Sequence, residues 1–200
     1  MASNDYHFFT RWRVQGTTVE EVATIIGDAA GLVRWWPSVY LDVQVLEPGD
    51  AQGLGKVVSL YTKGWLPYTL RWQFRVSEVR PDGFALKAWG DFDGWGNWTF
   101  TQQGEDVSIT YEWSVRADKP LLRSLSFLIK PIFAANHHWA MAQGEISLKL
   151  ELARRHAPTA EEREQVALPP GPTRVAWLPL LLGIAVVAGT IYGLARRRQG

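Results

Sequence analysis

The strongest constraint on the fold comes from the segment 119–155, whose apolar residues repeat with the period of an α-helix. Pro131 should kink this helix or divide it in its first third. One long amphipathic helix has to bury its apolar stripe against another layer, which the rest of the chain must supply. At about 100° per residue, the stripe contains Leu121, Leu125, Leu128, Ile129, Ile132, Asn136, Trp139, Gln143, Ile146 and Leu150.

Most of the chain before this helix alternates between apolar and polar residues, which is the period of a β-strand. In the segment 68–80, for example, Leu70, Trp72 and Phe74 share one face and alternate with charged or polar neighbours. This alternation favours an antiparallel sheet with one face exposed to water. We expect strands at 6–15, 40–50, 55–64, 68–80, 84–92, 97–103 and 107–118.

Two short helices are predicted between the first and second strands. Residues 17–28 have an apolar helical face, and either Thr17 or Thr18 can cap them. Residues 29–36 form a second helical turn that Pro37 ends. The predicted fold is therefore α+β: about seven antiparallel strands curve around one long C-terminal helix and leave a cavity between them.

Composition excludes several kinds of function. The 200 residues contain no cysteine, which rules out a disulfide scaffold, a thiol nucleophile and a cysteine metal cluster. The net charge of +1 gives no electrostatic reason to expect nucleic acid as a partner. The 11 tryptophans are unusually many. Because indoles are large, they predict a bulky core or a wide aromatic pocket.

The C-terminal part of the chain differs from the domain at 5–156. Residues 157–174 are rich in proline and charge and are predicted to be a linker. Residues 175–195 contain no charged side chain and reach the length that spans a bilayer, with a basic tail at 196–200. We expect a single transmembrane helix here; the alternative is a buried core helix. Because the first residues contain no secretory signal, we expect the domain in the cytoplasm.

The sequence also resembles a known superfamily. The resemblance is carried by the order of the elements, by WWPSV at 35–39, by GLGKVVSLYTKGWLPYTLRWQFRVSEV at 53–79, and by the long final helix. These features are similar to the START-like helix-grip (SRPBCC) proteins, and within them to the polyketide cyclase/dehydrase and lipid-transport family. The resemblance covers 5–155. It implies a cavity that holds lipids, aromatic polyketides or other apolar molecules, in carriers, binders and a minority of enzymes.

Candidate ligand-binding residues follow from the inward aromatic face of the sheet and from the helix stripe. Asn136 and Gln143 interrupt that stripe, and each either bonds a neighbouring group in the core or orients an apolar ligand. The two adjacent tryptophans should divide their roles, with Trp36 facing the cavity and Trp35 packing on the helices or meeting solvent. The predicted lining is Trp36, Tyr61, Trp72, Phe74, Trp98, Trp113, Asn136, Trp139 and Gln143.

The sequence gives no positive sign of catalysis. Asp42, Glu78, Asp91 and Glu112 fall on the polar sides of their strands, away from the predicted cavity. His137 and its neighbour His138 project about 100° apart, so they cannot share a metal as histidines at i and i+4 do. We expect no metal and no cofactor.

Three possibilities remain open, of which the last is a membrane-tethered interaction module whose cavity binds nothing. The first is a membrane-anchored module that binds or transports a hydrophobic small molecule or lipid. The alternative is a cyclase, aromatase or dehydratase acting on an apolar substrate in the same cavity, for which Tyr61, Tyr111, Asn136 and His137 are candidate polar groups. The hairpin tip at 65–67 either packs under the first helices or forms a lipid-facing lip.

Overall fold

The computed structural model describes residues 5–117 and 126–173. The predicted transmembrane segment 175–195 lies outside these residues, and none of the helices within them is long and apolar enough to cross a bilayer. The elements are β1 (Asp5–Gln15), α1 (Val19–Gly27), α2 (Leu32–Trp35), β2 (Tyr40–Glu47), β3 (Val57–Lys63), β4 (Thr69–Arg80), β5 (Gly83–Gly90), β6 (Phe92–Gln103), β7 (Asp106–Ala117), α4 (Ser126–His156) and α5 (Ala160–Gln165).

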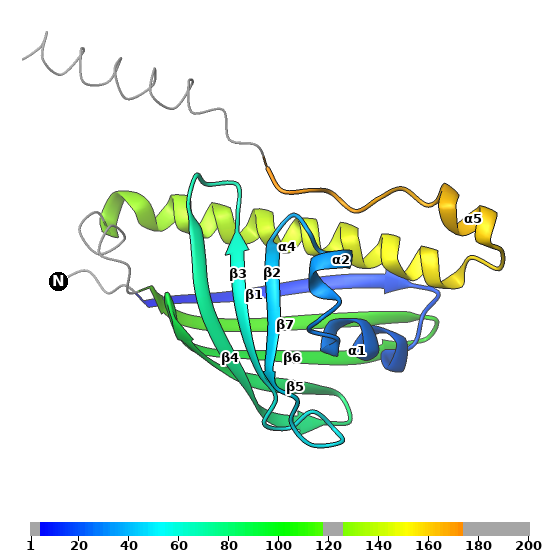
Figure 1. Cartoon of the computed structure of the whole chain (residues 1–200), viewed down its shortest axis with the longest axis horizontal. Helices are drawn as coiled ribbons and strands as arrows, with labels where there is room; N and C mark the ends of the chain where they lie inside the picture. Colours follow the sequence, from blue (N-terminus) through cyan, green and yellow to red (C-terminus); the bar gives the residue numbers. More distant parts are fainter. Residues whose placement is uncertain (1–4, 118–125, 174–200) are drawn as a thin grey trace, which may run out of the picture.

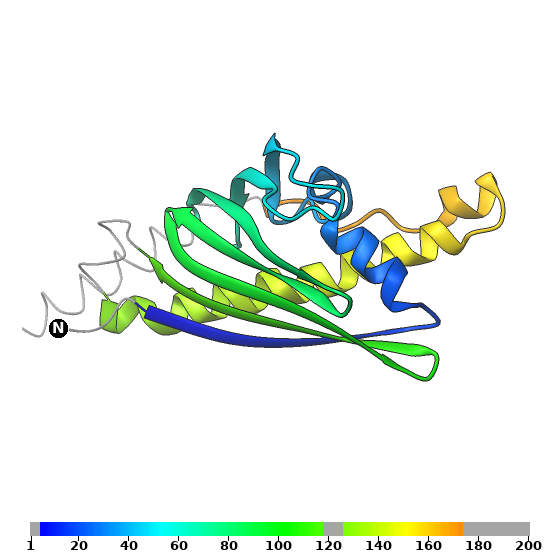
Figure 2. The same cartoon turned by 90° about the horizontal axis from the view of Figure 1, so that it is seen from below.

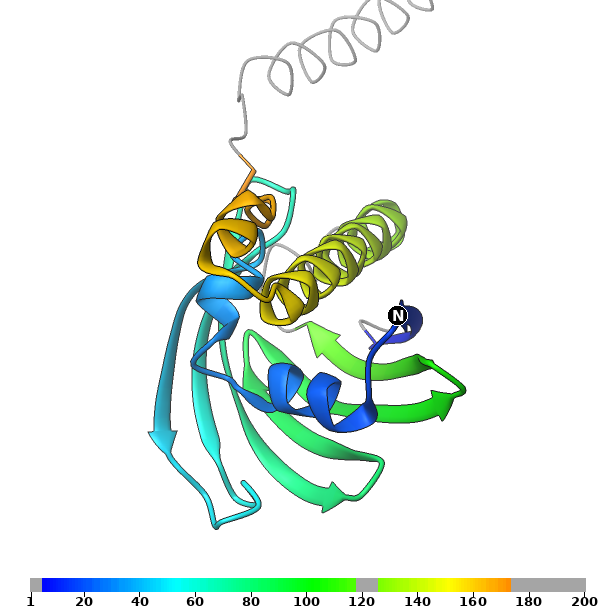
Figure 3. The ribbon, with the colours of Figure 1, turned by 90° about the vertical axis from the view of Figure 1, so that its right-hand side faces the viewer.

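The strands form one antiparallel sheet in the order β1-β7-β6-β5-β4-β3-β2. Although β1 comes first in the chain, it pairs with β7 along its whole length, for example Trp12 with Ile109. The sheet curves around α4, while α1 and α2 lie together at one end of it (Figures 1, 2 and 3). The predicted curved sheet of seven strands around a long helix is confirmed.

Helix α1 begins where the sequence placed it, and Thr18 is its cap. The Thr18 hydroxyl accepts from the backbone N–H of Glu21, and the Glu21 carboxylate accepts from the backbone N–H of Thr18. Such a capping box typically stabilises a helix by about 1 kcal/mol. It positions Val22 and Ile25, which are fully buried against the sheet.

Helix α4 continues through Pro131 as one element, so the predicted division there is wrong, and the alternative of a kink at Pro131 stays a prediction. Its buried face is also rotated from the predicted stripe: the buried residues include Phe133, Met141 and Leu148, whereas the side chains of Ile132 and Ile146 are 43% and 45% exposed. The buried side of α4 combines one aromatic residue, Phe133, which contacts Phe92 of the sheet, with the aliphatic Met141 and Leu148. Of the predicted stripe, Leu121, Leu125, Leu128 and Ile129 lie outside the described side chains.

The segment predicted as a linker is partly ordered against the domain. Thr159 caps α5 by accepting from the N–H of Glu162. After α5 the chain runs back alongside α4, and Arg154 of α4 donates to the carbonyls of Val166 and Ala167 (Figure 1). We call residues 166–173 the strap.

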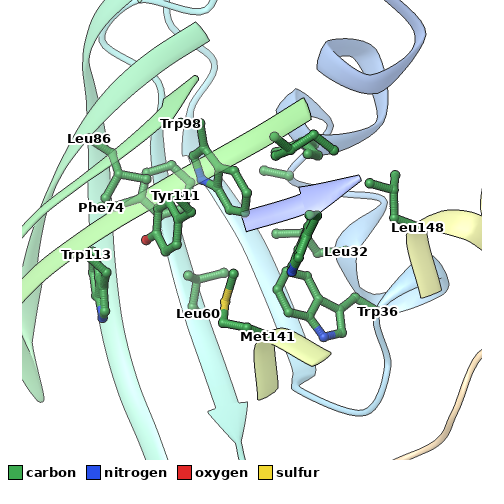
Figure 4. Close-up of a cluster of buried hydrophobic side chains, with 14 of the residues drawn as sticks. Leu32, Trp36, Leu60, Phe74, Leu86, Trp98, Tyr111, Trp113, Met141 and Leu148 are labelled. Atoms are coloured by element: carbon green, nitrogen blue, oxygen red, sulfur yellow. The ribbon is translucent and has the colours of Figure 1, made fainter. Parts of the chain in front are cut away.

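The core lies between the concave face of the sheet and α4. Figure 4 shows side chains from both layers converging there, among them Trp36, Leu60, Trp98, Tyr111 and Met141. Trp36 enters this core from the chain that follows α2, so the short helices close one end of the space enclosed by the sheet and α4.

Candidate ligand-binding cavity

A cavity of about 100 Å³ opens between α4 and the sheet, and we call it cavity 1. Since about 10–15 Å³ suffices for one water molecule, this space admits several waters or a small apolar group. A larger ligand requires side chains to move. Its lining is Trp36, Val39, Tyr40, Thr62, Lys63, Gly64, Leu70, Trp72, Phe92, Tyr111, Trp113, Phe133, Asn136, His137, Ala140 and Met141.

The wall on the sheet side is a cluster of contacting aromatic rings. The ring centroids of Trp72 and Trp113 are 5.5 Å apart, and Phe92 lies edge-on to both at 5.7 and 5.9 Å. Phe133 of α4 continues the cluster at 6.0 Å from Phe92. Edge-to-face and tilted contacts of this kind are the favourable arrangements of aromatic rings. They give the cavity a stiff apolar wall.

Four of the nine predicted lining residues border cavity 1, namely Trp36, Trp72, Trp113 and Asn136. Trp98 does not border cavity 1 but lies beside it on the inner face of the sheet, where it stacks on the lining residue Tyr111 with ring centroids 4.1 Å apart. Phe74 borders a second cavity instead. The structure does not bring Tyr61, Trp139 or Gln143 into the lining.

Each residue outside the lining has a physical reason for its position. In β3 the inward side chains are Leu60 and Thr62, so Tyr61 points to the outer face, where the Arg71 guanidinium lies 4.1 Å from its ring centroid. Trp139 and Gln143 lie on the side of α4 that carries the exposed Ile132 and Ile146. The rotation of the helix that exposes those isoleucines also keeps Trp139 and Gln143 out of the cavity.

Phe92 is a lining residue that the sequence analysis placed in the wrong strand. We expected a strand at 84–92, but the chain turns at Gly90, whose φ of 110° strongly favours glycine. Asp91 then accepts from the N–H of Arg71, and β6 begins at Phe92. The glycine itself was the signal that could have located this turn.

The adjacent tryptophans have different surroundings. Both are buried, at 1% exposed for Trp35 and 3% for Trp36, but only Trp36 borders cavity 1. The Trp36 indole packs on α4 at Gly144, where an added Cβ would overlap the ring carbon Cζ2. Glycine at 144 therefore allows α4 to approach this indole.

Polar groups in cavity 1 are few, and some of them pair with one another. The indole N–H of Trp72 donates to the hydroxyl of Thr62 at 3.1 Å. The side-chain carbonyl of Asn136 accepts from the backbone N–H of Leu66 at 3.3 Å. Asn136 thus bonds a neighbouring backbone group and also borders the cavity.

Two further polar atoms of lining residues are buried without a partner. These are the indole Nε1 of Trp36 and the ring Nε2 of His137; neither has a hydrogen bond to the part of the chain that the structure describes. An unsatisfied buried polar group costs about 1–3 kcal/mol. A ligand that bonded to either atom would remove that cost.

Burial also keeps the cavity lining largely uncharged. It lowers the pKa of His137 to about 3, with a smaller contribution from neighbouring His138, and the ring stacks on Phe8 at 4.0 Å. Burial raises the pKa values of Tyr40 and Tyr111 well above their usual range. Among the described residues that form the lining, Lys63 carries the one formal charge. A neutral His137 with so low a pKa is poorly matched to acid–base catalysis near neutral pH.

The second cavity, cavity 2, has a volume of about 200 Å³ and lies beneath α1 at the other end of β3 and β4. Its cations are already engaged: Lys56 donates to the Gly27 carbonyl, and Arg80 pairs with Glu78 and Asp82. Its lining is Ala23, Ile26, Gly27, Ala29, Leu32, Gln52, Gly53, Lys56, Phe74, Val76, Val79, Arg80, Pro81, Gly83, Phe84 and Phe100.

Comparison with known proteins identifies the architecture. No family model matches the sequence, and no curated protein matches it. Among solved structures, TTHA0849 from Thermus thermophilus is similar with a TM-score of 0.58 and 16% identity, over 72% of this chain and 97% of that one. The di-domain ARO/CYC BexL from the BE-7585A biosynthetic pathway is similar with a TM-score of 0.54 and 12% identity. The match covers 72% of this chain and 50% of that one.

A START superfamily protein from Mycobacterium smegmatis gives a TM-score of 0.50 and 13% identity, over 66% of this chain and 97% of that one. Identities this low carry the fold and not the activity. The sheet order, the curvature of the sheet around α4 and these likenesses agree. The chain has the helix-grip fold that START-like proteins and aromatase/cyclases share.

Proposed function

We propose that this protein binds a neutral hydrophobic small molecule or lipid in cavity 1 and carries or presents it at a membrane to which residues 175–195 anchor it. The observation that carries the proposal is the composition of the cavity. Aromatic rings form its wall, and its one histidine is kept neutral by burial. Such a site favours apolar ligands, and among the described lining residues only Lys63, which is half-buried at the rim, carries a charge.

The unpaired atoms refine the class of ligand. In a neutral indole the Nε1–H can only donate, so Trp36 favours a ligand with an acceptor such as a carbonyl or ether oxygen. The unpaired nitrogen of His137 can bond a ligand as donor or acceptor, depending on its tautomer. We therefore expect a largely apolar molecule with one or two oxygen atoms.

The experiment is ligand capture by the full chain. Native mass spectrometry of protein extracted in mild detergent should detect a bound apolar molecule, which organic extraction should release for identification. Titration with the neutral probe N-phenyl-1-naphthylamine should then be saturable and should compete with that molecule. Protein that is always empty and that binds no neutral apolar probe would contradict the proposal.

A second candidate function is cyclisation or aromatisation of a polyketide-like substrate. Two observations favour it: the fold likeness to a di-domain ARO/CYC protein, and the buried phenol of Tyr111 in the lining. Because burial raises its pKa, this phenol stays protonated and can donate to a substrate carbonyl. If Tyr111→Phe abolishes turnover in a reconstituted pathway but keeps binding, the enzyme is favoured; the carrier requires no turnover at all.

A further inference from the structure

The strap ends on the rim of cavity 1. The Thr173 hydroxyl donates to the Gly64 carbonyl at 3.1 Å, and the Lys63 ammonium donates to the Thr173 carbonyl. Lys63 is the last residue of β3 and Gly64 begins the connection to β4, and both border cavity 1. Two hydrogen bonds thus hold Thr173 beside the cavity. Its partners Gly64 and Lys63 are 109 and 110 positions away in the sequence.

The same rim is tied to α4. Asn136 bonds the backbone of Leu66 in the β3–β4 connection. The approach is so close that a Cβ added to Gly64 would overlap the Asn136 side-chain oxygen. The end of the strap, the β3–β4 connection and α4 therefore meet at one place. We call the surface formed by Lys63, Leu66, Ile132 and Thr173 the rim surface.

The rim surface and its surroundings expose apolar side chains. Ile132 lies one helical turn before Asn136, so it projects from the side of α4 that faces the β3–β4 connection, and it is 43% exposed. Further along the same side of α4, Ile146 is 45% exposed. In the strap, Leu168 is 84% exposed. Lys63 adds a cation that no carboxylate pairs with among the described residues.

The chain length beyond Thr173 fixes what can lie next to this surface. The uncharged segment 175–195 begins two residues later. Successive Cα atoms are at most about 3.8 Å apart, so Val175 begins within about 8 Å of Thr173. If this segment enters a bilayer at Val175, Thr173 on the rim surface lies within about 8 Å of the point of entry.

We infer that the rim surface rests on the lipid bilayer, so that cavity 1 opens towards the membrane and its ligand passes between protein and lipid without crossing bulk water. The inference rests on the membrane segment of the proposed function. Two features support a bilayer as the occupant: the short tether, and a surface that combines exposed aliphatic side chains with one cation. Lys63 is placed to meet a lipid phosphate.

Because the sequence has no cysteine, one introduced thiol reports one position. Leu66→Cys places the probe on the rim and keeps the backbone N–H that Asn136 binds. Ala51→Cys is the matched control, since it lies in the β2–β3 loop at the opposite end of β3 (Figure 1). Each full-length variant is labelled with an environment-sensitive fluorophore and reconstituted into phosphatidylcholine vesicles, with and without lipids that carry a nitroxide on the acyl chain.

We expect nitroxide lipids to quench the Leu66→Cys probe at least threefold more than the Ala51→Cys probe. Equal quenching at the two positions in vesicles that carry the protein would overturn the inference. Flotation of the vesicles and probe titration separate the two proposals. A chain that does not float overturns both the anchor and the inference. A chain that floats with unequal quenching but does not bind N-phenyl-1-naphthylamine overturns the ligand-binding function and the passage of a ligand, and leaves only the contact of the rim surface with the bilayer. Circular dichroism checks that both labelled variants are folded.

Discussion

The Trp36 indole lies against Gly144 of α4, so closely that a methyl group at 144 would overlap the ring. This contact joins the chain after α2 to the helix that covers cavity 1. It also sets the depth at which the indole enters the core. Because Trp36 borders cavity 1, the size of residue 144 affects the position of one wall of that cavity.

Gly144→Ala should therefore destabilise the protein. In an unobstructed helix interior the same change usually stabilises by about 0.5–1 kcal/mol. Here the forced shift of the indole should outweigh that gain and cost about 1–3 kcal/mol. Urea unfolding measures the difference, with Gln143→Ala as the control on a half-buried neighbour. A stabilised Gly144→Ala variant would show that the indole moves freely.

Trp36→Phe should weaken binding of ligands that carry an acceptor. The phenyl ring keeps the apolar wall but removes the unpaired N–H. One hydrogen bond contributes about 0.5–1.5 kcal/mol, which corresponds to a loss of affinity of about two- to twelvefold. We expect this loss of affinity for 1-acetonaphthone, which carries a carbonyl acceptor, but not for naphthalene, which has none. Displacement of N-phenyl-1-naphthylamine measures both affinities.

Trp35→Phe is the matched control for this experiment. The Trp35 N–H is also buried without a described partner, yet this residue does not border cavity 1. Its replacement should leave the ratio of the two affinities unchanged. If both variants change the ratio equally, the Trp36 N–H does not contact the ligand.

Thr62→Val should cost about 1–3 kcal/mol of folding free energy. The substitution removes the oxygen that accepts from the Trp72 indole and leaves a buried donor unpaired. In a Trp72→Phe background the same change should be nearly neutral, because the donor is already gone. A double-mutant cycle in urea measures this coupling. Strictly additive effects would show that the bond contributes nothing.

Stability should fall as the pH drops below about 6.5, because of His137. Burial lowers the pKa of this histidine from 6.5 to about 3 in the folded protein, so the unfolded chain binds the extra proton between these values. The contribution of the neutral His137 ring to the free energy of unfolding is fully present above pH 6.5. As the pH falls from 6.5 towards 3, the free energy of unfolding decreases by up to about 1.4 kcal/mol per pH unit.

His137→Phe should flatten this dependence between pH 6.5 and 4.5. The carboxylate of Glu21 bonds the His156 ring, and the pKa of Glu21 is lowered from 4.5 to about 2. The stability that Glu21 contributes is therefore lost only below pH 4.5, outside this window. Urea unfolding at several pH values measures the slope. An unchanged slope in the variant would assign the effect to other groups.

The sequence predicted the sheet better than the orientation of the helix. Period-two alternation placed Trp72 and Trp113 on the inner face correctly, because a strand has only two faces. It failed for Tyr61, since both faces of β3 carry residues that could be buried. On α4 the apolar residues cover a wide arc, and packing against Trp36 decides which part turns inward.

The strap could not be predicted from the sequence. Its contact between Thr173 and Gly64 joins residues 109 positions apart and uses one backbone carbonyl and one hydroxyl. Neither residue type marks such a contact in a sequence, and a proline-rich segment is typical of a free linker. The position of the strap on the rim of cavity 1 therefore came only from the structure.

The most direct test fills each cavity in turn and measures binding. Ala140 borders cavity 1 and Ala23 borders cavity 2, so Ala140→Phe and Ala23→Phe add the same ring to different sites. Thermal unfolding confirms that both variants fold, and calorimetric titration with N-phenyl-1-naphthylamine measures their affinity. We predict that Ala140→Phe loses at least tenfold in affinity while Ala23→Phe binds like the unmodified protein. Undiminished binding by Ala140→Phe, or loss in Ala23→Phe alone, would contradict ligand binding in cavity 1.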